Sequence, residues 1–292
     1  MSDSDLKQVT IVSGKGGTGK TTTVASFAAL GQDKVIADCD VDASNLYLLM
    51  HPEDTEQGEF VGAKVAVRDA DRCTRCGLCE EHCRFDAITV DEVDELACEG
   101  CGMCVVVCPE DALKLEPCVV GTWFTGVSAH GPMAHARLLP AAESSGRLVT
   151  LVRQKAEDLA YEHELPLILI DGPPGLGCTT TAALTETDLA IVVTEPSLSG
   201  IHDMERQVQL IDHFGLRAAV IINKFDINAE NTQHLRGWCA WKSLPLLGEI
   251  PWDPRVTDAL AAKQPLVTHN DGPAARAMRE TWARTAELIG EL

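Results

Sequence analysis

The chain has 292 residues, of which 45% are hydrophobic and 23% are charged, and its formal net charge is −20 at pH 7. This composition is typical of a globular protein, and the length suits one large α/β domain with a small inserted module. The negative charge, which no cluster of Lys or Arg interrupts, argues against binding to nucleic acid or to an anionic membrane surface.

The N-terminal residues and the cysteines indicate a cellular compartment. The start MSDSDLKQ lacks the basic and apolar segments of a signal peptide, and apolar runs such as LPLILI are too short to span a bilayer. We therefore expect a cytoplasmic protein that is not stably inserted into a membrane. Because disulfides are rare in the cytoplasm, the spacing of the 12 cysteines indicates metal ligation or redox chemistry.

The first predicted elements are a strand, a glycine-rich loop and a helix. The β-branched run at residues 9–13 precedes GKGGTGKTT, and the helical pattern TTVASFAALG follows and ends at Gly31. The loop fits GxxxxGK(S/T), in which backbone N–H groups bind phosphates, the lysine reaches the β and γ oxygens, and the hydroxyl ligates Mg²⁺. The residues expected to bind ATP or ADP here are Gly14, Lys15, Gly16, Gly17, Thr18, Gly19, Lys20, Thr21 and Thr22.

An extra lysine in this loop points to a family. Lys15, directly after the first glycine, resembles the deviant Walker A motif of the MinD, ParA, Mrp and nitrogenase iron-protein ATPases. The resemblance implies an ATP hydrolase in which Lys15 and Lys20 are catalytic, and in which Lys15 reaches across a dimer to the partner's nucleotide. It also implies an ATP-dependent homodimer, or a dimer with a paralogous ATPase.

The next predicted strand, KVIADCDVDASN, ends in a cluster of carboxylates. A carboxylate at the C-terminal end of such a strand lies at the crevice where an open α/β sheet binds its ligand. The cluster resembles the first switch of these ATPases, which implies that Asp40 positions or activates the attacking water and that Asp38, with Thr21, binds Mg²⁺. Asp42 and Asn45 are either switch residues or caps of the next helix.

The middle of the chain carries an internal repeat. CTRCGLCEEHCRFDAITV, from Cys73, and CEGCGMCVVVCPEDALKL, from Cys98, match with an offset of 25 residues. Each half reads CxxCxxCxxxC and resembles bacterial ferredoxins with two 4Fe–4S clusters, in which the fourth cysteine of each run serves the other cluster. The resemblance implies one cluster on Cys73, Cys76, Cys79 and Cys108 and a second cluster on Cys98, Cys101, Cys104 and Cys83.

Zinc is the competing metal, although zinc sites usually combine two separated CxxC pairs. Arg84 follows the first run at the position where Pro109 follows the second. We therefore expect the loop and the charge near one cluster to differ from those near the other, and the two clusters to have different reduction potentials. The inserted domain is predicted at 60–117, between ATPase segments 1–59 and 118–292. Lying between the two switches, it either responds to nucleotide state or is a passive insertion in a tolerant loop.

The segments after the insert continue the α/β pattern. TWFTGVSAHGPMAHARL and SSGRLVTLVR resemble the family's return into the ATPase domain. LPLILIDGPPG then predicts a buried parallel strand that delivers Asp171 toward Mg²⁺. This run resembles a Walker B segment and second switch, which implies that Asp171 is catalytic and that Gly175 offers its backbone N–H to the γ-phosphate.

Two further strands are predicted in DLAIVVTE and RAAVIINKFD, with a helix at 201–214 between them. NKFD resembles the guanine-reading NKxD of GTPases, whose aspartate would be Asp226. In the deviant Walker A group the asparagine, here Asn223, instead reads adenine together with a later loop around Pro251. We therefore expect ATP, with GTP as the alternative. Asp226 is either a base-reading residue or an ordinary turn residue after the strand.

The remaining cysteines and the C-terminal helix have ordinary interpretations. Cys39, Cys118, Cys178 and Cys239 are expected to be small buried side chains, although Cys178 follows the second switch and is a candidate contact for a dimer partner or a metal. In GPAARAMRETWARTAELIGEL, Met278, Trp282 and Ile289 fall on one face, which predicts a helix packed on the core rather than a membrane anchor.

Taken together, these patterns predict a doubly wound, mostly parallel α/β sheet of the P-loop NTPase type with an inserted α+β ferredoxin domain. Nearly the whole chain resembles the MinD-superfamily ATPases that contain such an insert. Three functions follow: an ATPase coupled to electron transfer or to metal-cofactor assembly on a client protein, a MinD-like spatial or cell-division switch with redox-sensing clusters, or a ferredoxin that binds nucleotide only for stability. We prefer the first.

Overall fold

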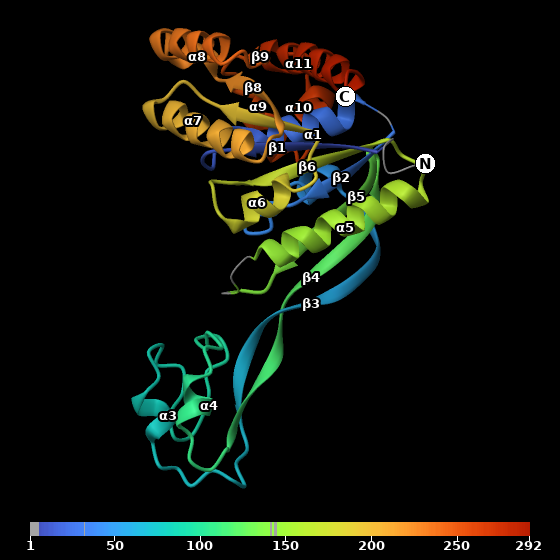
Figure 1. The fold of residues 1–292 in the computed structure, drawn as a ribbon. Coiled ribbons are helices and arrows are strands. Elements are labelled where there is room, and N and C mark those ends of the chain that lie inside the picture. Colours follow the sequence, from blue (N-terminus) through green and yellow to red (C-terminus); the bar gives the residue numbers. More distant parts are fainter. Residues whose placement is uncertain (1–5, 32, 141, 143–144) are drawn as a thin grey trace. The chain divides into compact units, whose positions relative to one another are not determined.

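The computed structural model describes residues 6–31, 33–140, 142 and 145–292 (Figure 1). The chain divides into two compact units. The large unit comprises Met1–Gln57, Trp123–Arg137 and Ser144–Leu292, and the small unit comprises Gly58–Thr122 and Leu138–Glu143. The predicted insert at 60–117 lies inside the small unit, which is longer at both ends and includes a second segment.

A nine-stranded sheet has the order β3-β4-β5-β2-β6-β1-β7-β8-β9. Its pairs from β5 through β9 are parallel, as the alternation of apolar runs and helical patterns predicts. The strands are β1 Lys7–Ser13, β2 Lys34–Asp38, β3 Glu53–Arg68, β4 Leu113–Ser128, β5 Gly131–Leu138, β6 Leu167–Pro174, β7 Leu189–Thr194, β8 Arg217–Asn223 and β9 Leu246–Ile250. The prediction of a doubly wound, mostly parallel sheet is therefore confirmed.

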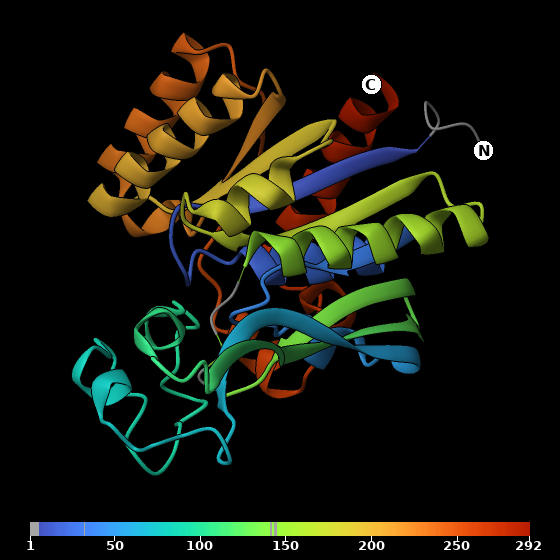
Figure 2. The same ribbon diagram turned by 60° about the horizontal axis from the view of Figure 1, so that its bottom comes forward.

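Helices cover both faces of the sheet. Successive side chains of a strand point to opposite faces, so Ile191 and Val193 of β7 join one apolar cluster while Ala190 and Val192 join another. Figure 2 shows α5 and α7 in front of the central strands and α11 behind them. The helices of the large unit are α1 Lys20–Leu30, α2 Tyr47–Met50, α5 Gly146–Glu162, α6 Cys178–Leu184, α7 Leu198–His213, η1 Phe225–Ile227, α8 Ala229–Trp241, α9 Arg255–Ala261, α10 Leu266–His269 and α11 Pro273–Gly290.

The C-terminal helix α11 packs on the core, as its apolar stripe predicts. Met278 is 2% exposed, and Trp282 and Ile289 pack at the edge of the same apolar cluster. The Trp282 ring lies 5.0 Å from that of Phe27 in α1, measured between ring centroids. None of the helices in the described part of the chain combines the length and the apolar composition that crossing a membrane requires.

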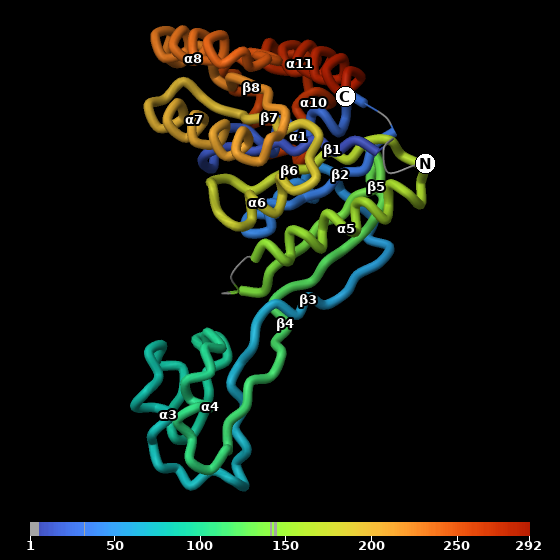
Figure 3. Tube along the Cα trace, in the orientation of Figure 1, coloured from blue at the N-terminus to red at the C-terminus, as the bar shows by residue number. Residues whose placement is uncertain are grey.

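The small unit is connected to the large unit through β3 and β4. Residues 53–57 of β3 and 123–128 of β4 belong to the large unit, and the remainder of both strands belongs to the small unit. The path of the chain from β3 to β4 can be followed in Figure 3. Between the two strands lie the short helices α3 Leu78–Glu81 and α4 Met103–Val107, each of which begins after a glycine of the cysteine repeat.

Gly248 of β9 tests how tightly α11 packs on the sheet. A Cβ at this position would lie 1.9 Å from Thr281 Oγ1, so Gly248→Ala should lower the free energy of unfolding by about 1–3 kcal/mol in a urea titration. Gly237→Ala in α8 is the control, because nothing lies within 4 Å of its added Cβ and Ala favours a helix by about 1 kcal/mol. Equal effects of the two changes would show that β9 and α11 adjust freely.

Candidate functional site

A cavity of about 650 Å³ lies over the loop between β1 and α1. It brings together the predicted phosphate loop, the first switch and the predicted base-reading residue Asn223. Predicted site residues that do not line it are Gly14, Lys15, Asp38, Asp171, Gly175 and Pro251. The cavity is lined by Ser13, Gly16, Gly17, Thr18, Gly19, Lys20, Thr21, Thr22, Asp40, Ala43, Asn45, Leu48, Leu49, Pro174, Asn223, Lys224, Ile250, Val256, Leu260, Lys263, Leu266 and Met278.

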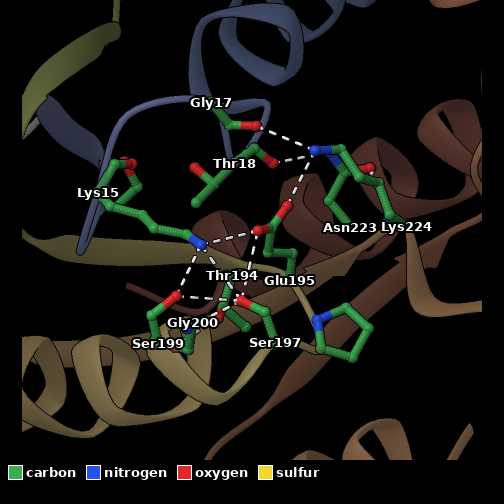
Figure 4. A network of polar contacts seen from close by, with 12 residues as sticks. Lys15, Gly17, Thr18, Thr194, Glu195, Ser197, Ser199, Gly200, Asn223 and Lys224 are labelled. Carbon is green, nitrogen blue, oxygen red and sulfur yellow. Dashed lines mark hydrogen bonds and ion pairs between the residues drawn. The ribbon is translucent and has the colours of Figure 1, made fainter. Parts of the chain in front are cut away.

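The glycines of the loop have conformations that other residues rarely adopt. Gly17 and Gly19 have φ angles of 83° and 96°, in the left-handed region. A Cβ on Gly19 would also lie 2.2 Å from the side-chain nitrogen of Asn223. That nitrogen donates a hydrogen bond to the Thr18 carbonyl oxygen at 2.7 Å (Figure 4). Asn223 thus holds the loop against the end of β8, and it can lie this close to the loop because Gly19 has no side chain.

Lys20 lies between two buried carboxylates. Its Nζ is 2.5 Å from Asp171 Oδ1 and 3.1 Å from Asp40 Oδ2, and the three residues are 5%, 1% and 7% exposed. Burial opposes the charge of Lys20, but Asp171 and Asp40 outweigh it and raise its pKa. Burial raises the pKa of Asp171, against the attraction of Lys20 and a hydrogen bond from Thr21.

Several buried oxygens around this ion pair are left without a partner. Among the described residues they include Asp40 Oδ1, Asp171 Oδ2 and the Thr18 hydroxyl. Buried carboxylate oxygens are costly without a partner, and they are the ligands that Mg²⁺ and its waters prefer. These residues therefore fit a bound Mg²⁺–nucleotide.

Asp38 binds the loop after β2, which the sequence predicts to be the first switch, and it does not line the cavity. Its Oδ2 accepts hydrogen bonds from Ser44 Oγ at 2.9 Å and from Leu46 N at 3.2 Å, and its Oδ1 accepts one from Asp40 N at 3.3 Å. Burial, with repulsion from Asp171, raises the pKa of Asp38 to about 8. A direct role of Asp38 at Mg²⁺ remains a prediction, and the geometry favours Asp40. Asn45 lines the cavity.

Lys15 is bound within its own chain. Its Nζ lies 2.8 Å from Glu195 Oε1 and within 3.2 Å of the hydroxyls of Ser197 and Ser199 (Figure 4). The other carboxylate oxygen of Glu195 lies 2.9 Å from Lys224 Nζ. Burial opposes ionisation of Glu195, but the two lysines outweigh it and lower its pKa.

Glu195 and Lys224 are residues of this site that the sequence patterns did not predict. Lys224 Nζ also donates to the Gly17 carbonyl oxygen at 3.1 Å, so it joins the phosphate loop to Glu195. Their position was the available signal, because Glu195 comes directly after β7 and Asp40 comes two residues after β2 ends. The carboxyl ends of parallel strands share one edge of the sheet.

Asn223 and Asp226 of the NKFD segment lie in different surroundings. Asn223 lines the cavity, whereas Asp226 Oδ1 accepts a hydrogen bond from Trp252 N at 2.7 Å and lines no part of it. The aspartate that would read guanine is thus used to fix the loop after β9. Pro251 is absent from the lining, although its neighbour Ile250 is present.

Gly175 is not arranged as the second-switch prediction supposes. Its N–H donates to the Ser13 carbonyl oxygen at 2.9 Å, and Gln207 Nε2 donates to the carbonyl oxygens of both residues. The Gly175 N–H would have to leave Ser13 before it could contact a phosphate. Its φ of 85°, which glycine adopts readily, leaves room for such a change.

The cysteines of the repeat line two cavities in the small unit. Cys73, Cys76, Cys79 and Cys108 line one, which we call the first cavity, and Cys83, Cys98, Cys101 and Cys104 line the other, the second cavity. These are the two ligand sets that the ferredoxin resemblance implies. Across the residues that the structure describes, no three His, Cys, Asp or Glu side chains are arranged as a single-ion metal site, so the clusters remain a prediction.

The four isolated cysteines differ in exposure. Cys39 and Cys239 are buried, as predicted, and burial raises the pKa of Cys239 to about 11. The expectation was wrong for Cys118, which is half-buried in the part of β4 that belongs to the small unit. Burial was also the wrong expectation for Cys178, which is exposed at the first residue of α6, so its thiol is accessible as the alternative role of a partner or metal contact requires.

The chain is similar to known nucleotide-binding proteins over most of its length. The family model described as CobQ/CobB/MinD/ParA nucleotide binding domain matches residues 9–266. An uncharacterized protein of Methanocaldococcus jannaschii is 31% identical over 97% of this chain and 98% of its own, and an uncharacterized ATP-binding protein of that organism is 27% identical over 97% and 87%. In fold, the septum site-determining protein MinD complexed with Mg-ADP from Pyrococcus horikoshii matches with a TM-score of 0.61, at 20% identity over 98% of each chain.

Lys20→Met should leave two buried carboxylates without their cation. At neutral pH the free energy of unfolding should fall by about 3–5 kcal/mol relative to wild type. Without Lys20, burial and Asp40 hold the pKa of Asp171 above its unfolded value. The folded variant therefore binds the extra proton, and its deficit should grow as the pH rises from about 5 to 8. Urea titrations at both ends of this range measure the effect.

The double variant Lys20→Met/Asp171→Asn is the matched control, because it removes one carboxylate together with the cation. It should recover part of the stability and lose most of the added pH dependence. A Lys20→Met protein whose stability follows pH as wild type does would contradict the account of this ion pair.

Proposed function

Because the chain belongs to the CobQ/CobB/MinD/ParA family of nucleotide-binding proteins, we propose that it is an ATPase whose switching or dimerisation is coupled to two 4Fe–4S clusters in the small unit. The coupling serves electron transfer, or the assembly of an iron–sulfur or metal cofactor on a client protein. The observation that carries the ATPase part is the convergence of Lys20, Asp40 and Asp171 beside the P-loop cavity.

The charges at the P-loop give each residue a role in hydrolysis. The phosphates of Mg²⁺–ATP compete with Asp40 and Asp171 for the ammonium group of Lys20. Once Lys20 contacts the phosphates, Asp40 is free to accept a hydrogen bond from the attacking water. Asp171 and the hydroxyl of Thr21 then serve Mg²⁺. Phosphate binding is thereby linked to release of the first-switch carboxylate.

The contacts of Lys15 support a nucleotide-dependent dimer. To reach a partner's nucleotide, Lys15 has to exchange Glu195, Ser197 and Ser199 for phosphate oxygens. A phosphate carries more negative charge than one carboxylate, so the exchange is favourable only when the partner presents a nucleotide. Lys224 remains to neutralise Glu195 after Lys15 has left.

ATP is the nucleotide that the cavity favours. Asp226 accepts a hydrogen bond from the backbone of Trp252 and does not line the cavity, whereas Asn223 does. The remaining wall is mostly apolar, with Val256, Leu260 and Leu266 among its members, which suits a flat heterocycle.

The small unit offers donors that suit an anionic cluster. Four thiols line each cavity, and backbone N–H groups point at their sulfurs, from Ala112 to Cys108 at 3.3 Å and from Ala66 to Cys98 at 3.5 Å. The buried Nε of Arg68, a residue that lines the first cavity, has no hydrogen-bond partner. When bound, such clusters supply one-electron chemistry.

The order of elements supports coupling between the two units. The loop that carries Asp40 leads into α2, and β3 begins at Glu53, three residues after α2 ends at Met50. A movement of the first switch is therefore close in sequence to the strand that enters the small unit. A second function, a MinD-like regulatory switch with redox-sensing clusters, is favoured by the fold likeness to MinD and predicts partner binding without electron or metal transfer.

Iron content tests whether the clusters exist. Anaerobically purified protein should contain about eight iron and eight acid-labile sulfide per chain. Cys73→Ser and Cys98→Ser should each lower both values by about half, since each removes a ligand of a different cluster. Cys118→Ser, whose thiol lines neither cavity, is the control. Bound zinc without sulfide would refute the cluster assignment.

The rate of ATP hydrolysis tests the proposed coupling. The iron-replete protein should hydrolyse ATP faster than GTP, and Asp40→Asn should lower the ATP rate at least tenfold. Chemical reduction of the clusters should change the rate in wild type but not in a protein that lacks both clusters. Equal rates before and after reduction would reject coupling and favour the regulatory or the passive alternative.

A further inference from the structure

We propose that the two cysteine cavities hold clusters of unequal reduction potential, and that Arg68 makes the first cavity the easier one to reduce. The proposal rests on the proposed function, because it requires clusters in both cavities. It concerns what this chain's own residues do to each cavity, and it identifies where an electron given to the small unit would reside.

The two cavities are built from equivalent positions of the repeat. At the offset of 25 residues, Val90, Ala112 and Leu113 of the first cavity correspond to Leu115, Ala87 and Ile88 of the second. Both sets are apolar and similar in size. Differences between the two cavities must therefore come from the few equivalent pairs whose chemistry differs.

The equivalence extends upstream to Asp69 and Asp94. Oδ1 of Asp69 accepts hydrogen bonds from the backbone N–H groups two and three residues later, and Oδ1 of Asp94 does the same. The backbone N–H of Asp69 donates to Ala112 O at 2.8 Å, and that of Asp94 donates to Ala87 O at 2.8 Å. The residues directly before them, Arg68 and Val93, are thus structural counterparts.

Arg68 is the main chemical difference between the cavities. It lines the first cavity, whereas its counterpart Val93 lines the second. Arg68 Nη2 lies 3.8 Å from Cys79 Sγ and also donates to the Thr89 carbonyl oxygen. Its Nε is buried and has no partner, and no carboxylate in the described part of the chain lies within ion-pair distance of it. The Arg68 guanidinium therefore contacts the Cys79 sulfur and the Thr89 carbonyl oxygen, and among the described residues no carboxylate neutralises it.

Other charges do not reverse this difference. Arg75 also lines the first cavity, but its side chain is 71% exposed and lies 3.4 Å from Asp91, so solvent screens it. Glu110 in the first cavity and Glu99 in the second contribute one negative charge each. Arg84, which the sequence comparison with Pro109 singled out, lines neither cavity and is exposed.

A positive donor beside a cluster favours the reduced form, which carries one more negative charge. Hydrogen bonds to sulfur and net charge are among the factors that set cluster potentials. Both cavities have a backbone N–H within 3.5 Å of a cysteine sulfur, from Ala112 to Cys108 in the first and from Ala66 to Cys98 in the second, so neutral backbone donors are common to the two. Arg68 is the additional donor, and it acts only on the first cavity.

A swap of the two counterparts tests the proposal. In the full-length, anaerobically purified protein, a potentiometric titration followed by electron paramagnetic resonance should show two unequal potentials. Arg68→Val should lower the higher potential by at least a tenfold change in the reduction equilibrium, which is about 59 mV for a one-electron couple. Val93→Arg should raise the lower potential. Arg72→Val is the control, since its 56% exposed side chain lines neither cavity and should shift both potentials much less.

Iron and sulfide content, measured first, separates failure of this proposal from failure of the proposed function. Protein without sulfide would refute the clusters themselves. Unchanged potentials in Arg68→Val at full iron content would overturn the role of Arg68. If the Arg68→Val protein loses iron, the Val93→Arg protein alone tests the proposal. An unchanged lower potential in Val93→Arg overturns the proposal, and a raised lower potential supports it.

Discussion

The ion pair of Lys20 with Asp171 and Asp40 is the interaction on which the rest of the large unit's site depends. An ammonium group buried among carboxylates is tolerated because each charge compensates the other, and removal of one would leave a charge that costs several kcal/mol. The three residues meet because β2, β6 and β1 are parallel neighbours whose C-terminal ends share one edge, with Asp38 in register with Asp171. The sheet order thus determines which charges surround the P-loop.

The other carboxylates at the same edge of the sheet differ in what they contact. Asp38 is occupied by the backbone and hydroxyl groups of the first-switch loop, which leaves Asp40 to face the cavity. On the other side of the P-loop, Glu195 is held by two lysines at once. Asp40 and Asp171 share Lys20, whereas Asp38 and Glu195 each have donors of their own, so a change in the contacts of Lys20 acts on Asp40 and Asp171 and leaves the other two carboxylates in place.

The sequence predicted the elements whose signal is local and left out those that depend on tertiary contacts. The spacing of Gly14, Gly19 and Lys20 and the apolar run before Asp171 define a P-loop and a buried strand without reference to the rest of the chain. The partners of Lys15 and the bond from Gly175 to Ser13 join residues far apart in sequence, so no spacing could reveal them. Likewise, Arg68 became significant only when its sulfur contact showed what it faces.

The way in which β3 and β4 carry the chain out of the large unit and back has an evolutionary consequence. The two strands are neighbours in the sheet, so the chain leaves and returns at adjacent positions. A short hairpin turn between residues 57 and 123 would close the same two strands and leave the remaining strand order untouched. The main segment of the small unit, Gly58–Thr122, could therefore be gained or lost through one local insertion or deletion in the gene, without a change in the order of the other strands.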